Sequence, residues 1–155
     1  MIRSQKKLGE ILIDRGLITS EQLKVAVQEQ VRTKEFLGAI LVKNRQIKEE
    51  DLLAALSEQF NMPVVNLKNK YIDWNFVASF SAELILNYRC FPVQRKEGAV
   101  TIAITNPLDV WALKKAEEET GGFKLQLVLA SEGDMEGVIR RYKQYLRGDL
   151  FRKFK

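Results

Sequence analysis

The sequence has 155 residues, of which 46% are hydrophobic and 29% are charged, a composition typical of a globular protein with one domain or two small ones. It contains no histidine and one cysteine, Cys90, which excludes an internal disulfide and the usual ligand sets for zinc and other transition metals. The net charge is +5, and it is concentrated in residues 138–155, whose seven basic residues and one acidic residue give +6. The nearly neutral remainder argues against a broad nucleic-acid-binding face.

The N-terminus and the apolar segments bear on location and activity. No stretch reaches the roughly 18 apolar residues of a membrane helix, and MIRSQKKLGE lacks the apolar core of a secretory signal. We therefore expect a cytoplasmic protein that does not insert into a membrane. The phosphate-binding pattern G-x-x-x-x-G-K-[ST] is absent, and so is histidine, the commonest general base, so we expect no enzymatic activity.

The first half of the chain contains an internal repeat. Residues 7–30 align without gaps on residues 36–59, at an offset of 29, and ten of the 24 pairs are identical. In the first repeat, apolar spacing predicts helices near Gln5–Arg15 and Ser20–Val31. Thr19 with Gln22 three residues later matches a capping box at the start of the second helix. Since one repeat alone cannot bury both apolar faces, the two repeats should pack as a four-helix unit.

Glycines mark three positions in these repeats. Gly9 and Gly38 fall in helical stretches, where glycine costs about 0.5–1 kcal/mol relative to alanine. Two explanations stay open, close packing of another helix, which we favour, and a ligand held against bare backbone. Gly16 should end its helix in a left-handed conformation. The second repeat has Arg45 at that place, so either Arg45 adopts this conformation or Asn44 does so in a shifted turn.

The second half of the chain predicts a small α/β layer. We expect strands at Val64–Leu67, Cys90–Gln94, Val100–Thr105 and Phe123–Leu129, with a turn at 96–98. Helices should cover Ser81–Asn87, Asn106 to about Thr120 with Asn106 as N-cap and Pro107 as first residue, and Ser131 to about Arg147. The predicted fold is α+β. It has a helical unit of tandem repeats at 1–62, an α/β unit with a three- to four-stranded sheet at 63–147, and a basic tail at 148–155.

Several conspicuous residues have ordinary structural explanations. Cys90 lies in the apolar stretch RCFPV, which favours a buried, inert thiol. Trp74 and Trp111 should serve packing. Glu117–Glu119 occupies successive helical positions, as expected for a solvated face. No pair of carboxylates therefore merits a catalytic role.

The repeats resemble a known family. Lys7-Leu8-Gly9, followed by Leu12-Ile13, Gly16, Ile18, Leu23, Ala26 and Gln30, and repeated from Leu37-Gly38 to Gln59, resembles the tandem motif of MshEN-type domains. Ser81–Tyr142 is similar to the second part of the same region. Such domains form the N-terminal region of type II secretion and type IV pilus assembly ATPases. The resemblance therefore implies a regulatory and docking module of such a system.

The resemblance also implies ligands and partners. A subset of the family binds cyclic di-GMP along the paired repeats, and no other cofactor is expected. The implied partners are the secretion ATPase and the cytoplasmic domain of an inner-membrane secretion or pilus assembly protein, which would hold the chain at the inner membrane. The alternative function is protein docking without nucleotide binding. The residues implied as cyclic di-GMP contacts are Lys7, Leu8, Gly9, Leu12, Ile13, Gly16, Leu23, Gln30, Leu37, Gly38, Leu41, Val42, Arg45, Leu52 and Gln59.

Two departures from repeat symmetry bear on nucleotide binding. Phe36 stands where the first repeat has Lys7, which removes one candidate contact to a phosphate or a guanine. Arg45 stands where the first repeat has Gly16, and it either blocks the second half of the site or supplies a phosphate contact of its own.

Overall fold

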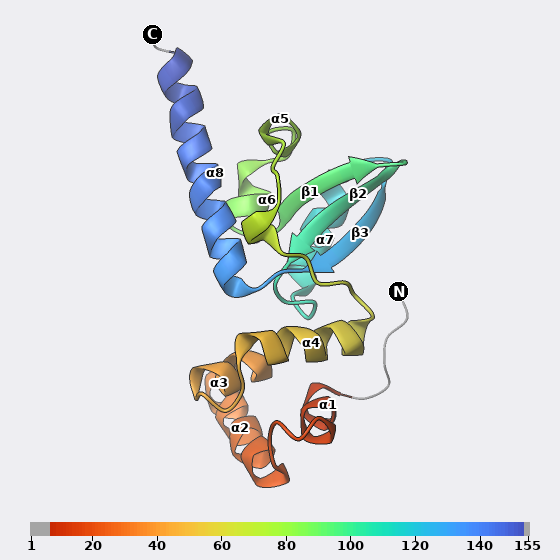
Figure 1. The fold of residues 1–155 in the computed structure, drawn as a ribbon, viewed down its shortest axis with the longest axis vertical. Helices are drawn as coiled ribbons and strands as arrows, with labels where there is room; N and C mark the ends of the chain where they lie inside the picture. Colours follow the sequence, from red (N-terminus) through yellow and green to blue (C-terminus); the bar gives the residue numbers. More distant parts are fainter. Residues whose placement is uncertain (1–6, 154–155) are drawn as a thin grey trace. The chain divides into compact units, whose positions relative to one another are not determined.

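The computed structural model describes residues 7–153, and the side chains of residues 7–148. The chain divides into two compact units, Met1–Met62 and Pro63–Lys155. The first unit is helical, and the second combines helices with a three-stranded mixed sheet (Figure 1). The fold is therefore α+β, as predicted.

Each repeat of the first unit forms a pair of helices. The first repeat gives α1 (Leu8–Asp14) and α2 (Ser20–Thr33), and the second gives α3 (Leu37–Lys43) and α4 (Glu49–Phe60). Helix α1 begins at Leu8, after Lys7, which is extended with φ −77° and ψ 159°. Gln5, where the sequence predicted the helix to begin, lies outside the described residues.

The predicted capping box begins α2. The Gln22 backbone N–H donates to Thr19 Oγ1 at 3.1 Å, and the Thr19 N–H donates to Gln22 Oε1 at 2.9 Å. At the start of α4, the Lys48 N–H donates to Asp51 Oδ2 at 3.1 Å. The second helix of each repeat is thus capped at its N-terminus by the side chain of its third residue.

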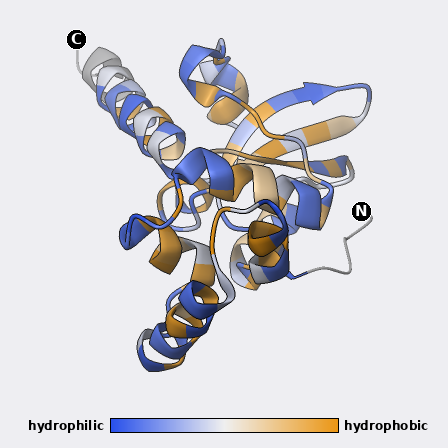
Figure 2. Ribbon diagram, turned by 60° about the horizontal axis from the view of Figure 1, so that its bottom comes forward, coloured by the Kyte–Doolittle hydropathy of each residue, from blue (hydrophilic) through white to orange (hydrophobic). Residues whose placement is uncertain are grey.

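The core of the helical unit repeats as the sequence does. Figure 2 shows its helices striped in orange and blue, as expected of amphipathic helices. Packing must stabilise these helices, because isolated helices shorter than about 12–15 residues are marginal in water. Buried residues at matching positions of the two repeats are Ile11 and Ile40, Leu12 and Leu41, Ile18 and Ile47, and Ala26 and Ala55.

The second unit is built on strands β1 (Phe91–Lys96), β2 (Ala99–Ile104) and β3 (Lys124–Leu129), in the order β1-β2-β3. Strands β1 and β2 are antiparallel and are joined by Glu97 and Gly98, both left-handed with φ 52° and 77°, the geometry of a type I′ hairpin turn. Strands β2 and β3 are parallel and are connected through α7 (Val110–Glu119).

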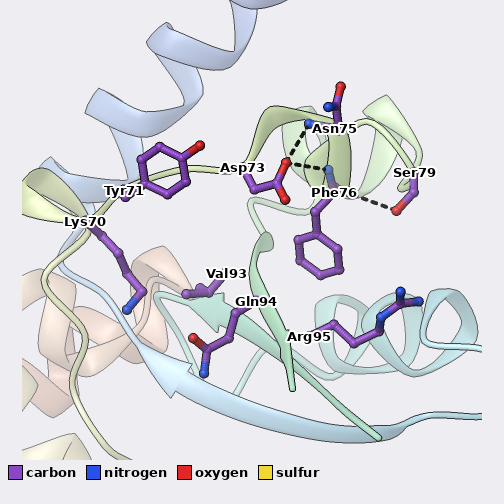
Figure 3. A pocket seen from close by; sticks show the side chains of 9 residues that line it. All are labelled: Lys70, Tyr71, Asp73, Asn75, Phe76, Ser79, Val93, Gln94 and Arg95. Atoms are coloured by element: carbon purple, nitrogen blue, oxygen red, sulfur yellow. Dashed lines mark hydrogen bonds between the residues drawn. The ribbon is translucent and has the colours of Figure 1, made fainter. Parts of the chain in front are cut away.

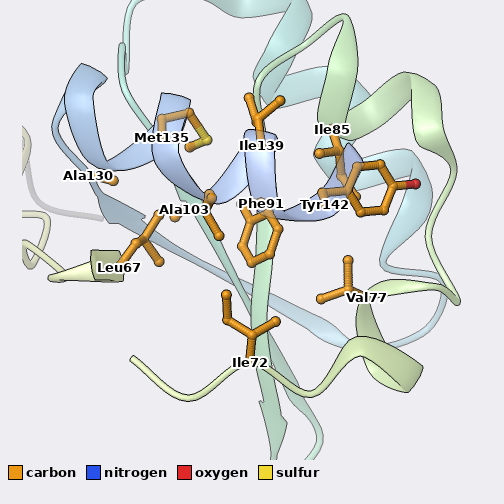
Figure 4. Packing of buried hydrophobic residues seen from close by; sticks show 11 residues of the cluster. Leu67, Ile72, Val77, Ile85, Phe91, Ala103, Ala130, Met135, Ile139 and Tyr142 are labelled. Atoms are coloured by element: carbon orange, nitrogen blue, oxygen red, sulfur yellow. The ribbon is translucent and has the colours of Figure 1, made fainter. Parts of the chain in front are cut away.

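Three further helices and one short turn of 3₁₀ helix complete this unit. They are α5 (Trp74–Val77), α6 (Ala82–Leu86), α8 (Glu132–Lys153) and the 3₁₀ turn η1 (Leu67–Asn69). Helix α8 lays Met135, Ile139 and Tyr142 against Phe91 of β1 and Ala103 of β2 (Figure 4). The α/β unit therefore has a core of its own.

The structure corrects one predicted strand. Val64–Leu67 is not a strand: Val64 forms a single bridge to Leu129, supported by a 2.8 Å hydrogen bond from the Val65 N–H to the Leu129 carbonyl. Leu67 then turns into the core cluster within η1. Pro63 has no N–H to donate, which limits the pairing on this side of β3.

Two helix boundaries also differ from the predictions. Helix α7 begins after Asp109, whose Oδ1 accepts the Ala112 N–H at 3.1 Å, whereas Asn106 Oδ1 accepts the Leu108 N–H at 2.9 Å in a separate turn. Helix α8 begins after Ser131, as predicted, but continues past Arg147 to Lys153. Of the expected basic tail, the side chains beyond 148 lie outside the described residues.

Candidate functional site

The two repeats of the helical unit are related by an approximate two-fold. Helix α1 packs against α4, and α3 packs against α2, so the first helix of each repeat meets the second helix of the other. The polar contacts follow the same rule. Arg15 Nη2 donates to Glu58 Oε1 at 3.1 Å, and Asn44 Nδ2 donates to Glu29 Oε2 at 2.9 Å. An offset of 29 residues converts one pair of positions into the other, as in a self-complementary two-fold interface.

The turn after α1 ends that helix in the predicted way. Gly16 is left-handed, with φ 73°. Its N–H donates to the Ile13 carbonyl at 2.9 Å, and the Leu17 N–H donates to the Leu12 carbonyl at 3.0 Å. These two bonds are those of a Schellman motif, which satisfies carbonyls at the end of the helix.

The turn after α3 has the same shape despite its arginine. Arg45 is itself left-handed, with φ 60°, whereas Asn44 has φ −80°. The Arg45 N–H donates to the Val42 carbonyl at 3.0 Å, and the Gln46 N–H donates to the Leu41 carbonyl at 2.9 Å. Of the two possibilities that the sequence left open, Arg45 therefore takes the left-handed position and the turn does not shift.

The helical glycines are explained by close packing. A Cβ placed on Gly9 would lie 2.7 Å from Leu23 Cδ1 and 2.8 Å from Leu23 Cδ2. A Cβ placed on Gly38 would lie 2.5 Å from Leu52 Cδ1 and 3.0 Å from Phe36 Cε1. The leucine of each second helix thus fills the space above the glycine of its own repeat. This is the explanation that we favoured from the sequence.

The residues implied as ligand contacts are not equally accessible. Three are exposed: Lys7, Gly16 and Arg45. Six are partly buried: Ile13, Leu23, Gln30, Leu37, Val42 and Leu52. Six are buried: Leu8, Gly9, Leu12, Gly38, Leu41 and Gln59. A ligand that binds without opening the core can contact only the exposed and the partly buried residues.

A shallow hollow of about 390 Å³ lies on the surface of α2. It includes Leu23, together with Ser20, Lys24 and Val27, which sequence reasoning did not select. Val27 matches Leu56 of the second repeat, a fully buried residue, yet is itself 40% exposed. Apolar periodicity identifies the inner face of a helix, and it gives no signal for a hollow on the outer face.

Charged and polar groups of the helical unit differ in whether they form ion pairs or hydrogen bonds. Lys43 Nζ pairs with Glu35 at 3.0 Å. Lys7, Lys24 and Arg45 are exposed, and no ion pair of theirs occurs in the described part of the chain. The Oε1 of Gln59, a residue only 6% exposed, has no hydrogen-bond partner among the described residues. Such a buried, unpaired oxygen costs about 1–3 kcal/mol.

Two expectations for the second unit are confirmed. Cys90 is fully buried, its thiol donates to the Ala112 carbonyl at 3.7 Å, and burial, with Asp109 and Glu119 nearby, raises its pKa to about 12. Trp74 is packed, with its ring stacked on Tyr145 at a centroid distance of 5.2 Å.

Two other expectations are wrong. Trp111 is 71% exposed, because it faces outward from the first turn of α7, where Lys114 Nζ lies 5.9 Å from its ring centroid. Of the expected solvated face, Glu117 and Glu118 are exposed as predicted, and the expectation is wrong for Glu119 alone, whose carboxylate accepts hydrogen bonds from the Ser81 N–H at 2.8 Å and from the Ser81 hydroxyl. It thereby ties the end of α7 to the start of α6 and also lies 3.6 Å from Lys115 Nζ.

Within residues 7–153, no helix has both the length and the apolar character needed to cross a membrane. In the same part of the chain, no cluster of three potential metal ligands occurs.

The chain is similar to parts of secretion and pilus ATPases. The model of the MshEN domain family matches residues 60–149. The type IV pilus assembly ATPase PilB of Myxococcus xanthus is 30% identical over 136 residues, which cover 88% of this chain and 24% of that protein. PilB of Thermus thermophilus is 30% identical over 118 residues, which cover 75% of this chain and 13% of that protein. The chain thus spans a quarter or less of the length of these relatives.

Solved structures extend the similarity over both units. A structure of MshE with cdg superposes with a TM-score of 0.81 at 25% identity, covering 89% of this chain and 99% of that one. The N-terminal domain of XpsE has the same fold, with a TM-score of 0.69 at 20% identity over 91% of this chain and 96% of that one. The family model itself covers the α/β unit, whereas the tandem repeats at 7–59 lie outside its match.

Proposed function

The chain belongs to the MshEN domain family, and from this premise we propose that it is a regulatory and docking module of a type IV pilus or type II secretion ATPase whose tandem repeats bind cyclic di-GMP. The two PilB relatives support the ATPase system. The MshE structure with cdg supports the nucleotide, since cdg denotes cyclic di-GMP and that chain is matched over 99% of its length.

The two-fold relation of the repeats is the observation that carries the nucleotide proposal. Cyclic di-GMP consists of two identical guanosine monophosphate halves closed into a ring. A protein surface with two equivalent half-sites suits such a ligand. The reciprocal pairs Arg15–Glu58 and Asn44–Glu29 and the matching turns at Gly16 and Arg45 supply that equivalence.

The accessible groups suggest which residues of each half-site contact the phosphates and which contact the guanines. Lys7 and Arg45 are exposed cations, one in each repeat, and a cation that donates a hydrogen bond to a phosphate oxygen gains about 1.5–3 kcal/mol. Leu23 and Leu52 are partly buried leucines that cover the glycines and offer apolar surface to a guanine. The buried leucines Leu8, Leu12 and Leu41 then act through the core and do not touch the ligand.

Protein docking without a nucleotide is the second candidate function. Phe36 at the place of Lys7 and Arg45 at the place of Gly16 make the half-sites chemically unequal although their backbones agree. This inequality weakens the case for one symmetric ligand. In either case we propose that the chain itself does not hydrolyse nucleotides, that it works in the cytoplasm, and that it docks its ATPase onto an inner-membrane assembly protein.

Isothermal titration of cyclic di-GMP into the 155-residue chain tests the nucleotide proposal. We expect saturable heat for the wild type. Lys7→Ala should weaken affinity about ten-fold or more, because it removes a charged hydrogen-bond donor while Lys7 caps α1 only through its backbone. Lys114→Ala removes another exposed charge, on α7, and is the matched control, with affinity expected within about two-fold of wild type. Absence of heat for the wild type would leave protein docking as the function.

A further inference from the structure

A cavity of about 650 Å³ lies within the α/β unit, and all of its lining residues belong to that unit. It opens between the segment 70–79, which contains α5, and the strand β1 (Figure 3). Lys70, Tyr71 and Asn75 line one side, and Gln94 and Arg95 of β1 line the other. Its volume falls within the roughly 300–1,000 Å³ typical of ligand sites.

The cavity carries positive charge that its own residues do not neutralise. Lys70 and Arg95 make no ion pair within the part of the chain that the structure describes. Asp73 is the acidic residue of the lining, and its Oδ1 already accepts the N–H groups of Asn75 at 3.1 Å and Phe76 at 3.3 Å. The Arg95 guanidinium lies 5.0 Å from the Phe123 ring centroid, a contact that orients the cation and leaves its charge in place.

The backbone of β1 adds hydrogen-bonding groups to this surface. Within residues 7–153, strand β1 is an edge strand that pairs only with β2. Because the type I′ turn makes Lys96 and Ala99 the hydrogen-bonded closing pair, the alternation of an antiparallel ladder directs the N–H and C=O of Arg95 away from β2. An extended segment can pair with an open strand edge of this kind.

The remaining features distinguish a peptide from a free anion. Tyr71 stands at the cavity and is 87% exposed, and exposed tyrosines frequently serve as anchors in protein interfaces. The side-chain amides of Asn75 and Gln94 are hydrogen-bonded to no group among the described residues. A phosphate ion requires only a compact group of donors, whereas this lining spreads cations, amides, an aromatic ring and strand backbone over a larger surface.

We propose that this cavity docks an extended acidic segment of a protein partner, with its carboxylates at Lys70 and Arg95. The inference rests on the docking role proposed above, and it names the surface and the chemistry of the partner.

Fluorescence anisotropy with two labelled octapeptides tests the inference on the full chain. One peptide alternates glutamate with threonine, and the other alternates lysine with threonine. We expect saturable binding of the acidic peptide alone, weakened as sodium chloride is raised. The double variant Lys70→Gln, Arg95→Gln should lose at least about ten-fold in affinity. Lys114→Gln, which removes an exposed charge outside the cavity, should stay within about two-fold of wild type.

Three outcomes would overturn the inference: equal binding of the acidic peptide to wild type and double variant, equal binding of both peptides, or displacement by inorganic phosphate at constant ionic strength.

Co-purification with the cytoplasmic domain of a pilus inner-membrane protein tests the docking role separately from the peptide site. If wild type and double variant both co-purify, docking stands and this surface is wrong. If neither co-purifies while the acidic peptide still binds as expected, the docking role fails and the cavity remains an acidic-peptide site.

Discussion

Arg45 shows how one residue can change while the backbone around it does not. It occupies the left-handed position that Gly16 holds in the first repeat, with φ 60° against 73°, and the hydrogen bonds of the two turns agree within 0.1 Å. A left-handed conformation costs an L-residue about 1–2 kcal/mol. The second repeat therefore carries backbone strain that the first repeat avoids.

We expect Arg45→Gly to raise the free energy of unfolding of the helical unit by about 0.5–1 kcal/mol. Glycine relieves the left-handed strain in the folded state, and its greater freedom in the unfolded chain offsets part of that gain. Gly16→Arg is the reciprocal control and should lower it by a similar amount. Urea unfolding followed by far-UV circular dichroism measures both. A loss of stability in Arg45→Gly would mean that the arginine side chain makes a stabilising contact in solution.

At the residue scale, predictions held where the cause is local or where the setting is strongly apolar. The chain around Gly16 and Thr19 contains the groups that end and begin the helices, and Cys90 lies among apolar neighbours. Trp111 was not predictable in the same way, because its exposure depends on which face of α7 is buried, the one that carries Ala112 and Ala116. Which accessible side chains meet a ligand depends likewise on tertiary packing, so that part of the candidate site remains a prediction.

At the scale of elements, the errors fall where two local signals compete. Both Asn106 and Asp109 can cap a helix. Asp109 is the residue that does so, because Asn106 is used by the turn that leads out of β2. Val64–Leu67 has the composition of a strand, but Leu67 contributes more by entering the core cluster. Such choices depend on the partners that a segment meets, which a single sequence does not display.

The contacts of Gly9 with Leu23 and of Gly38 with Leu52 predict an energetic coupling between the helices of each repeat. We expect Gly9→Ala to destabilise the chain by about 1 kcal/mol, since the new Cβ must displace the Leu23 side chain from 2.7 Å. In a Leu23→Ala background the same change should be neutral or stabilising, because alanine favours helix and the space is free.

A double-mutant cycle from urea unfolding measures this coupling, expected at about 0.5–1.5 kcal/mol. Gly38→Ala combined with Leu23→Ala is the matched control, because Gly38 faces Leu52. Additive effects for Gly9 and Leu23, equal to those of the control pair, would show that the glycine serves another purpose than packing.

At the scale of the whole molecule, periodicity and repetition were sufficient to predict an α+β fold with a helical unit of two helix pairs and a small sheet. The repeat offset of 29 residues implied a paired arrangement before any contact was known. Its approximate two-fold, with each first helix against the opposite second helix, was not predictable. Amphipathic spacing states which face of a helix is buried, and it does not state against which partner.

The two compact units allow ligand binding to be assigned within the whole chain. A ligand that binds only the folded helical unit stabilises that unit by about 2.7 kcal/mol at 100 times its dissociation constant, which for some 60 residues raises its melting temperature by roughly 10–20 °C. Both tryptophans, Trp74 and Trp111, lie in the α/β unit, so their fluorescence follows that unit alone.

Far-UV circular dichroism reports the helices of both units. With cyclic di-GMP present, we therefore expect the part of its transition that does not coincide with the tryptophan transition to move to a higher temperature, while the tryptophan transition stays in place. Cyclic di-AMP at the same concentration is the control for a non-specific effect of a charged dinucleotide. A shift of the tryptophan transition alone would move the nucleotide site to the α/β unit and away from the repeats. A common shift of both transitions would mean that the two units unfold together, and the chain would then transmit nucleotide binding at the repeats directly to the unit that carries the proposed docking cavity.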